Sequence, residues 1–520
     1  MKRSAYILLL AVALGSCKKS FLDQDPYGGT IQSSTYYSTL DEARSATLAT
    51  YAYIDYNDWW QTQWWRQVSG EAASDNEWMG LNGGQPTAVQ ATHYTLNPEN
   101  DRLEAQWIMI YKSIYQFNAT IEGVQKAPID ETAKQQLLGE LKFLRAFSYF
   151  DLVRNWGGVP LITKTLGPKD NTYERASAKE VYDFVRQDLN SAIGVLPNKA
   201  QYSSTDKFRV SKGAAQALLA KVDLYTENWA EAQTVAAQVI NGGDYTLETA
   251  FGDIWKGSNF NGKESIFEIQ YQYLTQYPNL GNIFPVASMA GTEGGWGYFT
   301  PTSDLENAYR DQGDSIRLNW TIMRHNFPVV GDPANPSFNA NPAQSKSARF
   351  NRKIYIPRGE RTPNNRYSKD HIYLRLADVY LMHAEASAML QQSGPALASL
   401  EKVRSRVNLP TDHTLTGWAL IRAVRNERRL ELALEGDRLY DIRRWKDEGG
   451  QPVINSIFGP NGSFVKYNTQ VSKDPYETTN LNEPQDKGAK FRAGTHNLWP
   501  IPTKEIIASE GRIKQNPGYN

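Results

Sequence analysis

The sequence predicts a mainly α-helical protein, in which helix pairs of the tetratricopeptide type form a scaffold that carries long irregular loops and a few short strands. Residues 133–153 repeat large apolar side chains at steps of three and four, which indicates a long helix. Two Ala-rich segments, 211–240 and 372–407, each have the pattern of a helix–turn–helix pair. Between these pairs, residues 241–370 are rich in Gly, Pro and Asn and have few helical runs.

The segment 133–153 predicts a helix that is buried on two sides. Its second half is apolar nearly all round, so no polar face remains for solvent. The glycines and the proline of residues 155–160 are expected to end it. The apolar positions of its helical repeat are Leu137, Leu141, Leu144, Phe147 and Phe150.

In each predicted pair, small side chains allow two helices to approach closely. The first pair spans residues 211–225 and 229–240. The second pair spans residues 372–390 and 396–407, with a Gly-Pro break between its helices.

The remaining segments are expected to be strand or loop. Residues 265–273 alternate in the manner of a strand, whereas 327–366 and 447–498 have the composition of long excursions over the surface. We expect residues 17–240 to form an N-terminal helical region and residues 241–520 a C-terminal region of one compact body.

The N-terminus has the pattern of a bacterial lipoprotein signal. Lys2 and Arg3 precede the apolar run 5–15, which is shorter than the roughly 20 residues that a membrane-spanning helix needs. The run leads through small residues to Cys17, the sole cysteine, in a pattern that resembles a lipobox. We therefore expect residues 1–16 to be a cleaved signal peptide and Cys17 to receive the diacylglycerol and an N-linked acyl group such as palmitate. An ordinary secretory signal with a chance cysteine is the alternative.

Charge and cysteine content exclude several functional classes. Lys+Arg and Asp+Glu are balanced at 56 each, so the chain lacks the basic excess usual for nucleic-acid binders, and we expect no nucleic-acid partner. A single cysteine excludes an intrachain disulfide and a multi-cysteine metal site.

Aromatic residues make up 12% of the chain, with 14 Trp and 29 Tyr, which suits a protein that presents flat apolar surfaces to a ligand.

Motifs for cofactor and metal chemistry are incomplete. Residues 257–263 have the glycine and lysine spacing of a phosphate loop, but Glu264 stands where a Ser or Thr is required. The six histidines are scattered, and neither His-Glu-x-x-His nor Gly-x-Ser-x-Gly occurs. His383 lies among apolar helix positions, where we expect a hydrogen-bonded structural role. We therefore assign no cofactor, no metal and no catalytic residue.

A glycoside hydrolase needs only two suitably separated carboxylates, so composition does not exclude one. Glu71, Asp75 and Glu77 lie beside tryptophans, as catalytic acids in sugar clefts do. The alternative, which we favour, is a solvated or capping acidic loop.

Residues 424–445 form an arginine-rich run, VRNERRLELALEGDRLYDIRRW. Its mixed charges at helical spacing indicate an ion-pair network along a packed helix and not a nucleic-acid patch. Arg428 with Glu431, and Arg425 with Glu427, occupy neighbouring or near-neighbouring positions on that helix.

A cluster of tryptophans is the most informative feature. Trp59, Trp60, Trp64, Trp65 and Trp78 fall within 20 residues. On a helix the first four point in directions spread over about 240°, and on a strand they divide between two faces. Because one buried face cannot hold them all, we expect some rings to contact solvent, a ligand or a partner, with burial in the core as the alternative.

Polar residues near this cluster are suited to sugar hydroxyls. Asp75, Asn76 and Asn82 lie in a loop-like stretch around Trp78. Aromatic rings stack on the C–H faces of sugars, while the hydroxyls need fixed polar partners. A second candidate loop carries Trp296 and Tyr298 among glycines, where a tryptophan has little local reason to be buried.

Seven segments carry a resemblance to a known family. They are FLDQDP (21–26), FLRAFSYFDLVRNWGGVPLI (143–162), KESIFEIQY (263–271), RLADVYLMHAEA (375–386), VRNERRLELALEGDRLYDIRRW (424–445), LWPIP (498–502) and QNPGY (515–519). Together, in this order and over nearly the whole chain, they resemble the RagB/SusD family of Bacteroidetes outer-membrane lipoproteins.

The resemblance implies a SusD-like, mostly α-helical fold with four tetratricopeptide-like helix pairs. It also implies a lipoprotein on the extracellular face of the outer membrane that caps a SusC-like TonB-dependent transporter. Family members deliver glycans, or in some cases peptides, without catalysis. By their flanking residues, Trp78 and Trp296 resemble the two tryptophans that stack on sugar in starch-binding members. Residues 59–65 add tryptophans to that pattern.

The leading hypothesis is therefore a non-enzymatic, surface-anchored lipoprotein that captures oligosaccharide for uptake across the outer membrane. A peptide ligand with the same fold and transporter partner is one alternative. A lipid-anchored glycoside hydrolase that uses Glu71 or Asp75 is the other.

Overall fold

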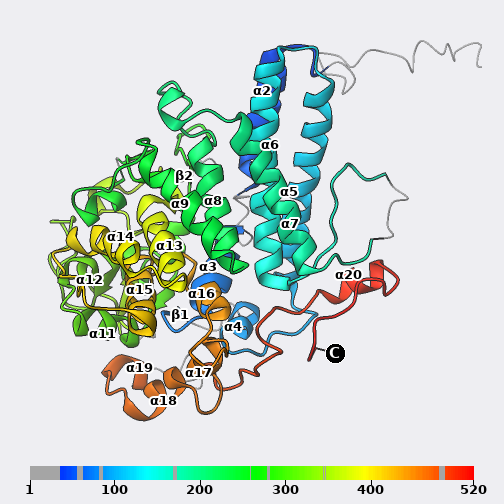
Figure 1. Ribbon diagram of the computed structural model, residues 1–520. Helices are drawn as coiled ribbons and strands as arrows, with labels where there is room; N and C mark the ends of the chain where they lie inside the picture. Colours follow the sequence, from blue (N-terminus) through cyan, green and yellow to red (C-terminus); the bar gives the residue numbers. More distant parts are fainter. Residues whose placement is uncertain are drawn as a thin grey trace, which may run out of the picture.

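A stack of paired helices forms the scaffold of the protein (Figure 1). From α5 to α9 each helix packs on the next, α9 packs on α13, and α13 packs on α14 and α15. The helices of this stack are α5 (Asp101–Lys126), α6 (Glu131–Trp156), α7 (Ala178–Val195), α8 (Lys212–Tyr225), α9 (Trp229–Asn241), α13 (Leu376–Met389), α14 (Ser393–Ser405) and α15 (Gly417–Glu431). The computed structural model describes residues 36–54, 62–80, 86–167, 173–257, 259–277, 281–342, 345, 347–362, 364–479 and 487–519.

The two predicted helix pairs are neighbours in this stack, because α9 of the first pair packs on α13 of the second. Buried alanines lie in both helices, among them Ala232 and Ala236 of α9 and Ala377 and Ala384 of α13. Small side chains allow the close approach that joins the pairs into one array. The prediction of a mainly α-helical fold with a few short strands is confirmed.

Helix α6 confirms the prediction of a helix buried on more than one side. Its described length runs from Glu131 to Trp156, and almost every residue from Leu137 onward is buried. The Asp130 side chain accepts a hydrogen bond from the backbone of Ala133 at the N-terminus, and Gly157, with a φ of +72°, ends the helix.

The second predicted pair begins later than expected. Residues His371–Arg375 form strand β6, which pairs antiparallel with β2 (Ser265–Ile269), and helix α13 starts only at Leu376. The strand forms because a distant segment supplies its backbone partner, which helical spacing alone does not reveal. The Gly-Pro break also lies inside α14, in its first turn, where a proline needs no hydrogen-bond partner for its nitrogen.

The strands of the described residues form three two-stranded ribbons. Strand β1 pairs with β3, β2 with β6, and β4 with β5, all antiparallel. The remaining strands are β1 (Glu77–Gly80), β3 (Tyr298–Pro301), β4 (Ile322–Arg324) and β5 (Arg349–Asn351).

The other helices are short and lie around the stack, with α17 to α19 below it in the view of Figure 1 and α20 near the C-terminus. They are α2 (Leu40–Thr50), α3 (Thr62–Gln67), α4 (Pro86–Thr92), α10 (Phe284–Ala287), α11 (Ser303–Asp311), α12 (Ser315–Thr321), α16 (Arg438–Arg444), α17 (Ile454–Ile457), α18 (Ser463–Lys466), α19 (Pro475–Thr479) and α20 (Thr503–Ala508). None of the helices in the described parts of the chain combines the length and the apolar character needed to span a bilayer.

The segment 327–366, expected to run over the surface, buries apolar residues in a small core that it shares with neighbouring segments. This core includes Val329, Phe338, Phe350 and Tyr355. The pairing of β4 with β5 gathers these scattered apolar residues, so the prediction of a purely superficial loop is wrong.

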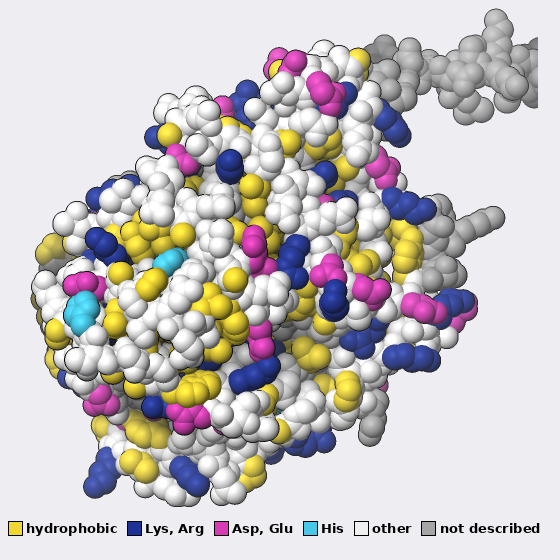
Figure 2. Space-filling model, viewed as in Figure 1, with side chains coloured by type: hydrophobic (Ala, Val, Ile, Leu, Met, Phe, Trp, Pro, Cys, Tyr) yellow, Lys and Arg dark blue, Asp and Glu magenta, His cyan; other side chains and the backbone are white. Residues whose placement is uncertain are grey.

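On the face shown in Figure 2, basic and acidic side chains are interspersed over the whole molecule.

Candidate functional site

Three of the predicted aromatic residues, Trp64, Trp78 and Tyr298, come together at the β1–β3 ribbon. In its register, Trp78 lies opposite Thr300 and Gly80 lies opposite Tyr298. Trp296 precedes β3 by two residues, so the two tryptophans singled out in the sequence belong to paired segments. The ribbon is therefore the natural centre of a candidate ligand site.

Trp78, however, lies inside the protein. Its side chain is 0% exposed, and its indole Nε1 donates a hydrogen bond of 3.0 Å to Glu477. The Lys487 ammonium lies 5.3 Å from its ring centroid, and the Phe464 ring lies 6.0 Å away. The expectation of an exposed ring is wrong, because the C-terminal part of the chain covers a residue that its local sequence marks as loop-like.

Trp64 and Trp65 are also buried. The Trp64 ring contacts Tyr298 at 4.7 Å and Phe299 at 4.6 Å between centroids. Helix α3, which carries both tryptophans, packs on α5 as well, so rings that point in different directions all meet protein. Both residues thus belong to the core side of the expected division, which stays a prediction for the four tryptophans as a set. Trp59, Trp60 and Asn82 lie outside the described residues.

Trp296 and Tyr298 are the candidate aromatics that keep part of their surface exposed. The backbone of Trp296 donates to the Val286 carbonyl at 2.9 Å, and Gly297 donates to Met289 at 2.8 Å. Gly297 adopts a φ of +78°, which favours glycine. A partly exposed aromatic ring on a hydrogen-bonded turn presents a fixed surface for stacking.

Asp75 and Asn76 are buried and engaged by arginines. Arg438 donates two hydrogen bonds of 2.8 Å to the Asp75 carboxylate, and Arg429 donates one of 2.8 Å to Asn76 Oδ1. Burial alone would raise the pKa of Asp75, but Arg429 and Arg438 hold it below its usual range. Thr302 ties the same loop to the end of β3 through the Asp75 carbonyl, at 2.8 Å. These two residues support the ribbon from within.

Glu71 is buried among backbone donors. Its carboxylate accepts hydrogen bonds from the backbone of Leu434 at 2.8 Å and of Gly436 at 3.2 Å, and from the Asn76 amide at 2.8 Å. Burial raises the pKa of Glu71 to about 7, while these three hydrogen bonds oppose the rise.

Glu77 is likewise buried, and burial raises its pKa well above the usual value. Its carboxylate accepts a hydrogen bond of 2.8 Å from Gln67. The expected solvated or capping acidic loop is therefore not solvated, because Glu71, Asp75 and Glu77 are all buried. A hydrolytic pair needs carboxylates that reach a substrate, and the two proposed acids, Glu71 and Asp75, are instead enclosed and hydrogen-bonded.

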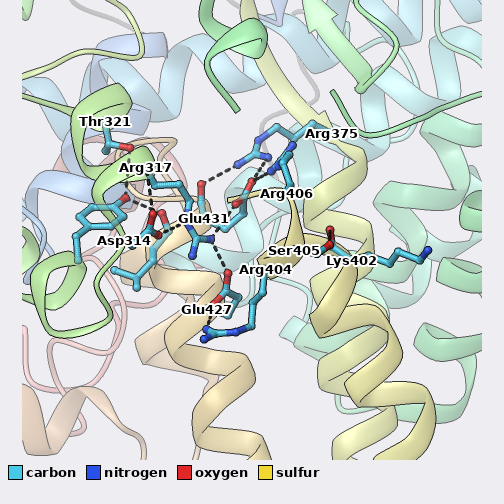
Figure 3. A network of polar contacts seen from close by, with 12 residues as sticks. Asp314, Arg317, Thr321, Arg375, Lys402, Arg404, Ser405, Arg406, Glu427 and Glu431 are labelled. Carbon is cyan, nitrogen blue, oxygen red and sulfur yellow. Dashed lines mark hydrogen bonds and ion pairs between the residues drawn. The ribbon is translucent and has the colours of Figure 1, made fainter. Parts of the chain in front are cut away.

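The arginine-rich run forms the predicted ion-pair network, shown in Figure 3. Glu431 of α15 accepts from Arg375 at 2.6 Å and pairs with Arg317 at 3.0 Å, and Arg406 also contacts it. The network joins distant parts of the chain, because most of the arginines that pair with α15 come from other elements.

The neighbouring positions noted in the run do not pair with one another. Arg428 pairs with Asp441 at 2.7 Å and with Asp378, whereas Glu427 pairs with Arg317 at 2.5 Å and Arg404 at 2.7 Å. The adjacent residues Glu427 and Arg428 thus point to different neighbouring elements. His383 has the expected structural role, with Nδ1 at 2.8 Å from the Ser399 hydroxyl.

Sequence reasoning missed a cavity of about 530 Å³ beside α15, which includes Trp418 and Arg425 in its walls. The sequence signal for this cavity was the single tryptophan at the start of that helix, next to the arginine-rich run.

Among the described residues, no group of three or more His, Cys, Asp or Glu side chains is placed to hold a metal ion.

Comparisons with known families agree with this architecture. A family model described as the SusD family matches residues 254–519, and one described as "starch-binding associating with outer membrane" matches residues 21–224. The first match alone covers more than half of the chain. The chain therefore belongs to the SusD family, and the resemblance found in the sequence is confirmed.

Individual relatives are distant but span the whole length. A SusD-like protein of Bacteroides ovatus is 25% identical over 94% of this chain and 90% of its own. SusD-like protein P2 of Formosa agariphila is 26% identical and covers 99% of both chains. Among solved structures, a laminarin-binding SusD-like protein has 27% identity and a TM-score of 0.72, covering 92% of this chain and 99% of that one. A SusD-like carbohydrate-binding protein of Bacteroides fragilis, at 24% identity, a TM-score of 0.76 and coverage of 91% and 99%, shares the fold.

Proposed function

We propose that this protein is a glycan-binding lipoprotein of the outer-membrane surface that captures oligosaccharide and caps a SusC-like TonB-dependent transporter. The observation that carries the proposal is membership of the SusD family over nearly the whole chain. The 27% identity with a laminarin-binding relative supports the glycan class.

Within the described residues, Trp296 and Tyr298 are our candidates for the stacking surface, because both rings are partly exposed on a hydrogen-bonded turn. Trp59, Trp60 and Asn82 remain candidates from the sequence. We assign to Trp64, Trp65, Trp78, Asp75 and Asn76 the support of this surface, since all five are buried.

Affinity electrophoresis in gels that contain laminarin, starch or other neutral and acidic glycans tests the proposal. We expect at least one glycan to retard the wild-type protein, and Trp296→Ala to lose most of that retardation, because aromatic anchors contribute about 2 kcal/mol or more. Trp229→Ala is the matched control, since Trp229 is also partly buried but opens α9, away from the ribbon.

Three outcomes would redirect the proposal. Retardation by no glycan, together with binding of peptides, would favour the peptide-binding alternative. Release of reducing ends during incubation would favour the hydrolase. Equal retention of Trp296→Ala and the wild type would remove this residue from the site.

The anchor and the partner need separate tests. Cys17→Ala should leave the protein unprocessed or soluble, because acyl chains contribute about 0.8 kcal/mol per buried CH₂ group. Persistence of this variant in the outer membrane without the transporter would contradict the lipid anchor.

Gentle detergent extraction should recover the protein in complex with a transporter. We expect the two proteins to share an interface above about 2,000 Å², as in stable complexes. A lone monomer would contradict the capping role.

A further inference from the structure

The cavity beside α15 has walls built from cations and indoles. It lies between α15, α16 and the turn that follows α16, and its volume of about 530 Å³ is in the range of small-molecule sites. Its cationic and aromatic lining consists of Arg422, Arg425, Arg429, Arg438, Trp418 and Trp445.

Three of the four arginines already have carboxylate partners. Arg438 binds Asp75 through two hydrogen bonds of 2.8 Å, and Arg429 pairs with Asp304 at 2.5 Å. Arg422, at the exposed rim, pairs with Glu448 at 2.9 Å.

The carboxylates that line the cavity are also engaged. Glu448 is the partner of Arg422, and Asp447 accepts the backbone N–H groups of Gly449 and Gln451 at 2.9 Å each. Neither lies within ion-pair distance of Arg425.

Arg425 is the exception among the arginines of this cavity. It is 9% exposed, and no carboxylate of the described residues lies within ion-pair distance of it. One Nη1 hydrogen bond, of 2.8 Å, goes to the Lys446 carbonyl, while the buried Nε has no acceptor. The guanidinium lies 5.7 Å from the Trp418 centroid and 5.1 Å from that of Trp445.

This arrangement is costly for folding alone. An arginine stays protonated in proteins, and a buried charge without a directly paired counter-ion destabilises the folded state, although the more distant Glu385 and Asp441 offset part of the cost here. Burial accordingly lowers the pKa of Arg425. Indole faces offset part of the cost through cation–π attraction, but they leave the Nε donor unsatisfied.

We propose that this cavity binds the anionic group of an acidic saccharide, a uronate carboxylate or a sulfate ester, with Arg425 as its counter-ion. The planar guanidinium presents donors in the geometry that carboxylate and sulfate oxygens accept. Trp418, half-buried at the rim, offers an apolar face for the sugar ring, and Asn426 supplies an amide for hydroxyl groups. The inference rests on the proposed glycan-binding function and adds the charge class of the ligand.

One loop links the cavity to the β1–β3 ribbon. Asp75 and Asn76 directly precede β1, and both accept hydrogen bonds from arginines of the cavity wall, Arg438 and Arg429. A saccharide site at the cavity would thus share its supporting residues with the Trp296 surface.

Isothermal titration calorimetry with three oligosaccharides of equal length tests the proposal: an oligouronate, a sulfated neutral-sugar oligomer and an uncharged oligomer. We expect at least one acidic oligomer to bind at least tenfold more tightly than the uncharged one. The uronate and the sulfated arms distinguish the two anionic groups. Arg425→Met should weaken the acidic ligand at least tenfold without lowering the thermal midpoint, because it removes an unpaired buried charge.

Two further variants sharpen the result. Arg512→Met removes the same charge from the segment after α20 and should leave affinity unchanged, which excludes an effect of net charge. Arg425→Lys retains a cation but loses the planar fork, so it should fold and still bind at least threefold more weakly than the wild type.

The contrary results are distinct. The inference fails if acidic and uncharged oligomers bind equally, or if both Arg425 variants retain wild-type affinity. An acidic peptide that binds more tightly than any saccharide, in an Arg425-dependent manner, would assign the cavity to a protein partner. Binding of uncharged glycan alone would leave the proposed function intact and overturn only this inference, whereas binding of no glycan at all would overturn the proposed function itself.

Discussion

At the scale of single residues, Trp78 and Trp296 differ in what covers their rings. Trp78 and Trp296 both lie in polar, glycine-containing surroundings, yet only Trp296 keeps exposed surface. The difference comes from Glu477 and Lys487, which reach Trp78 from the far end of the chain. A tryptophan in a loop-like segment is therefore a ligand candidate only after the rest of the chain has been placed.

Trp78→Ala should destabilise the protein strongly. Removal of a fully buried indole leaves a cavity and takes one hydrogen bond from the Glu477 carboxylate, and large-to-small changes of this kind cost about 3–5 kcal/mol. Urea unfolding of this variant beside Trp296→Ala measures the contrast, because removal of the partly exposed Trp296 ring should lower the free energy of unfolding clearly less. Equal stability of Trp78→Ala and the wild type would contradict the buried position.

His496 predicts a pH-dependent contribution to stability. It is 3% exposed, and its Nδ1 accepts the Arg492 backbone N–H at 2.9 Å. Burial first, and then the cations Arg492 and Arg443, lower its pKa to about 4. An unfolded histidine titrates near about 6.5, so the unfolded chain binds more protons between these two values. The free energy of unfolding should therefore fall as pH drops through this window, by at most about 3 kcal/mol.

Urea unfolding of the wild type and His496→Gln at pH 7 and pH 4.5 checks this prediction. The glutamine side chain at position 496 cannot take up a proton, so the free energy of unfolding of this variant should fall less over the same pH interval. Other groups titrate identically in both proteins and cancel in the comparison. Parallel losses of stability would show that His496 contributes nothing to the pH dependence.

At the scale of elements, α15 (Gly417–Glu431) organises the C-terminal half by charge. Glu427 and Glu431 point into the protein and gather arginines from other segments, including Arg317 and Arg375 (Figure 3). Arg425, on another side of the same helix, lines the cavity. One helix thus carries both a buried network of ion pairs and a cation without a carboxylate within ion-pair distance among the described residues.

Glu431→Gln should destabilise this element more than any exposed pair does. Burial opposes the charge, but Arg406, Arg375 and Arg317 hold the pKa of Glu431 well below its usual range, so it remains ionised in mild acid. Loss of one partner from a buried network costs about 3–5 kcal/mol, since the remaining charges stay buried.

Glu448→Gln is the matched control for that variant. Glu448 and its partner Arg422 are both more than half exposed, and exposed pairs contribute at most about 1 kcal/mol. Thermal unfolding of the two variants under identical salt conditions gives the comparison. Similar shifts in the midpoint would contradict the importance of burial in this network.

At the scale of the whole molecule, the N-terminal and C-terminal halves share contacts throughout. Lys221 pairs with Asp437 at 2.6 Å, and the Asn155 carbonyl accepts from the Trp499 backbone at 2.8 Å. Helix α9 packs on α13 across the long intervening segment. Each half consequently presents apolar surface that only the other half covers.

Fragments 17–240 and 241–520 should therefore fail to fold separately. We expect each one alone to give a broad thermal transition by circular dichroism, and the two together to recover a cooperative one, because α9 and α13 bury their surfaces against each other. A fragment that unfolds cooperatively near the midpoint of the full chain would show that the halves are independent domains.

The sequence by itself determined the elements whose signals are local. Helical periodicity identified α6 and both helix pairs, and the seven family segments identified the SusD family. The mixed charges of residues 424–445 predicted an ion-pair network, which the structure contains. Periodicity and spacing carry this information because neighbouring residues on a helix share a face.

Only the tertiary structure decided which partners these residues meet. The start of α13 shifted because β2 pairs with residues 371–375, and Glu431 found arginines far away in the sequence in place of Arg428. Trp78 became buried and Arg425 came to line a cavity for the same reason. Burial and ion pairing depend on segments separated by tens to hundreds of residues, and no local pattern records their approach.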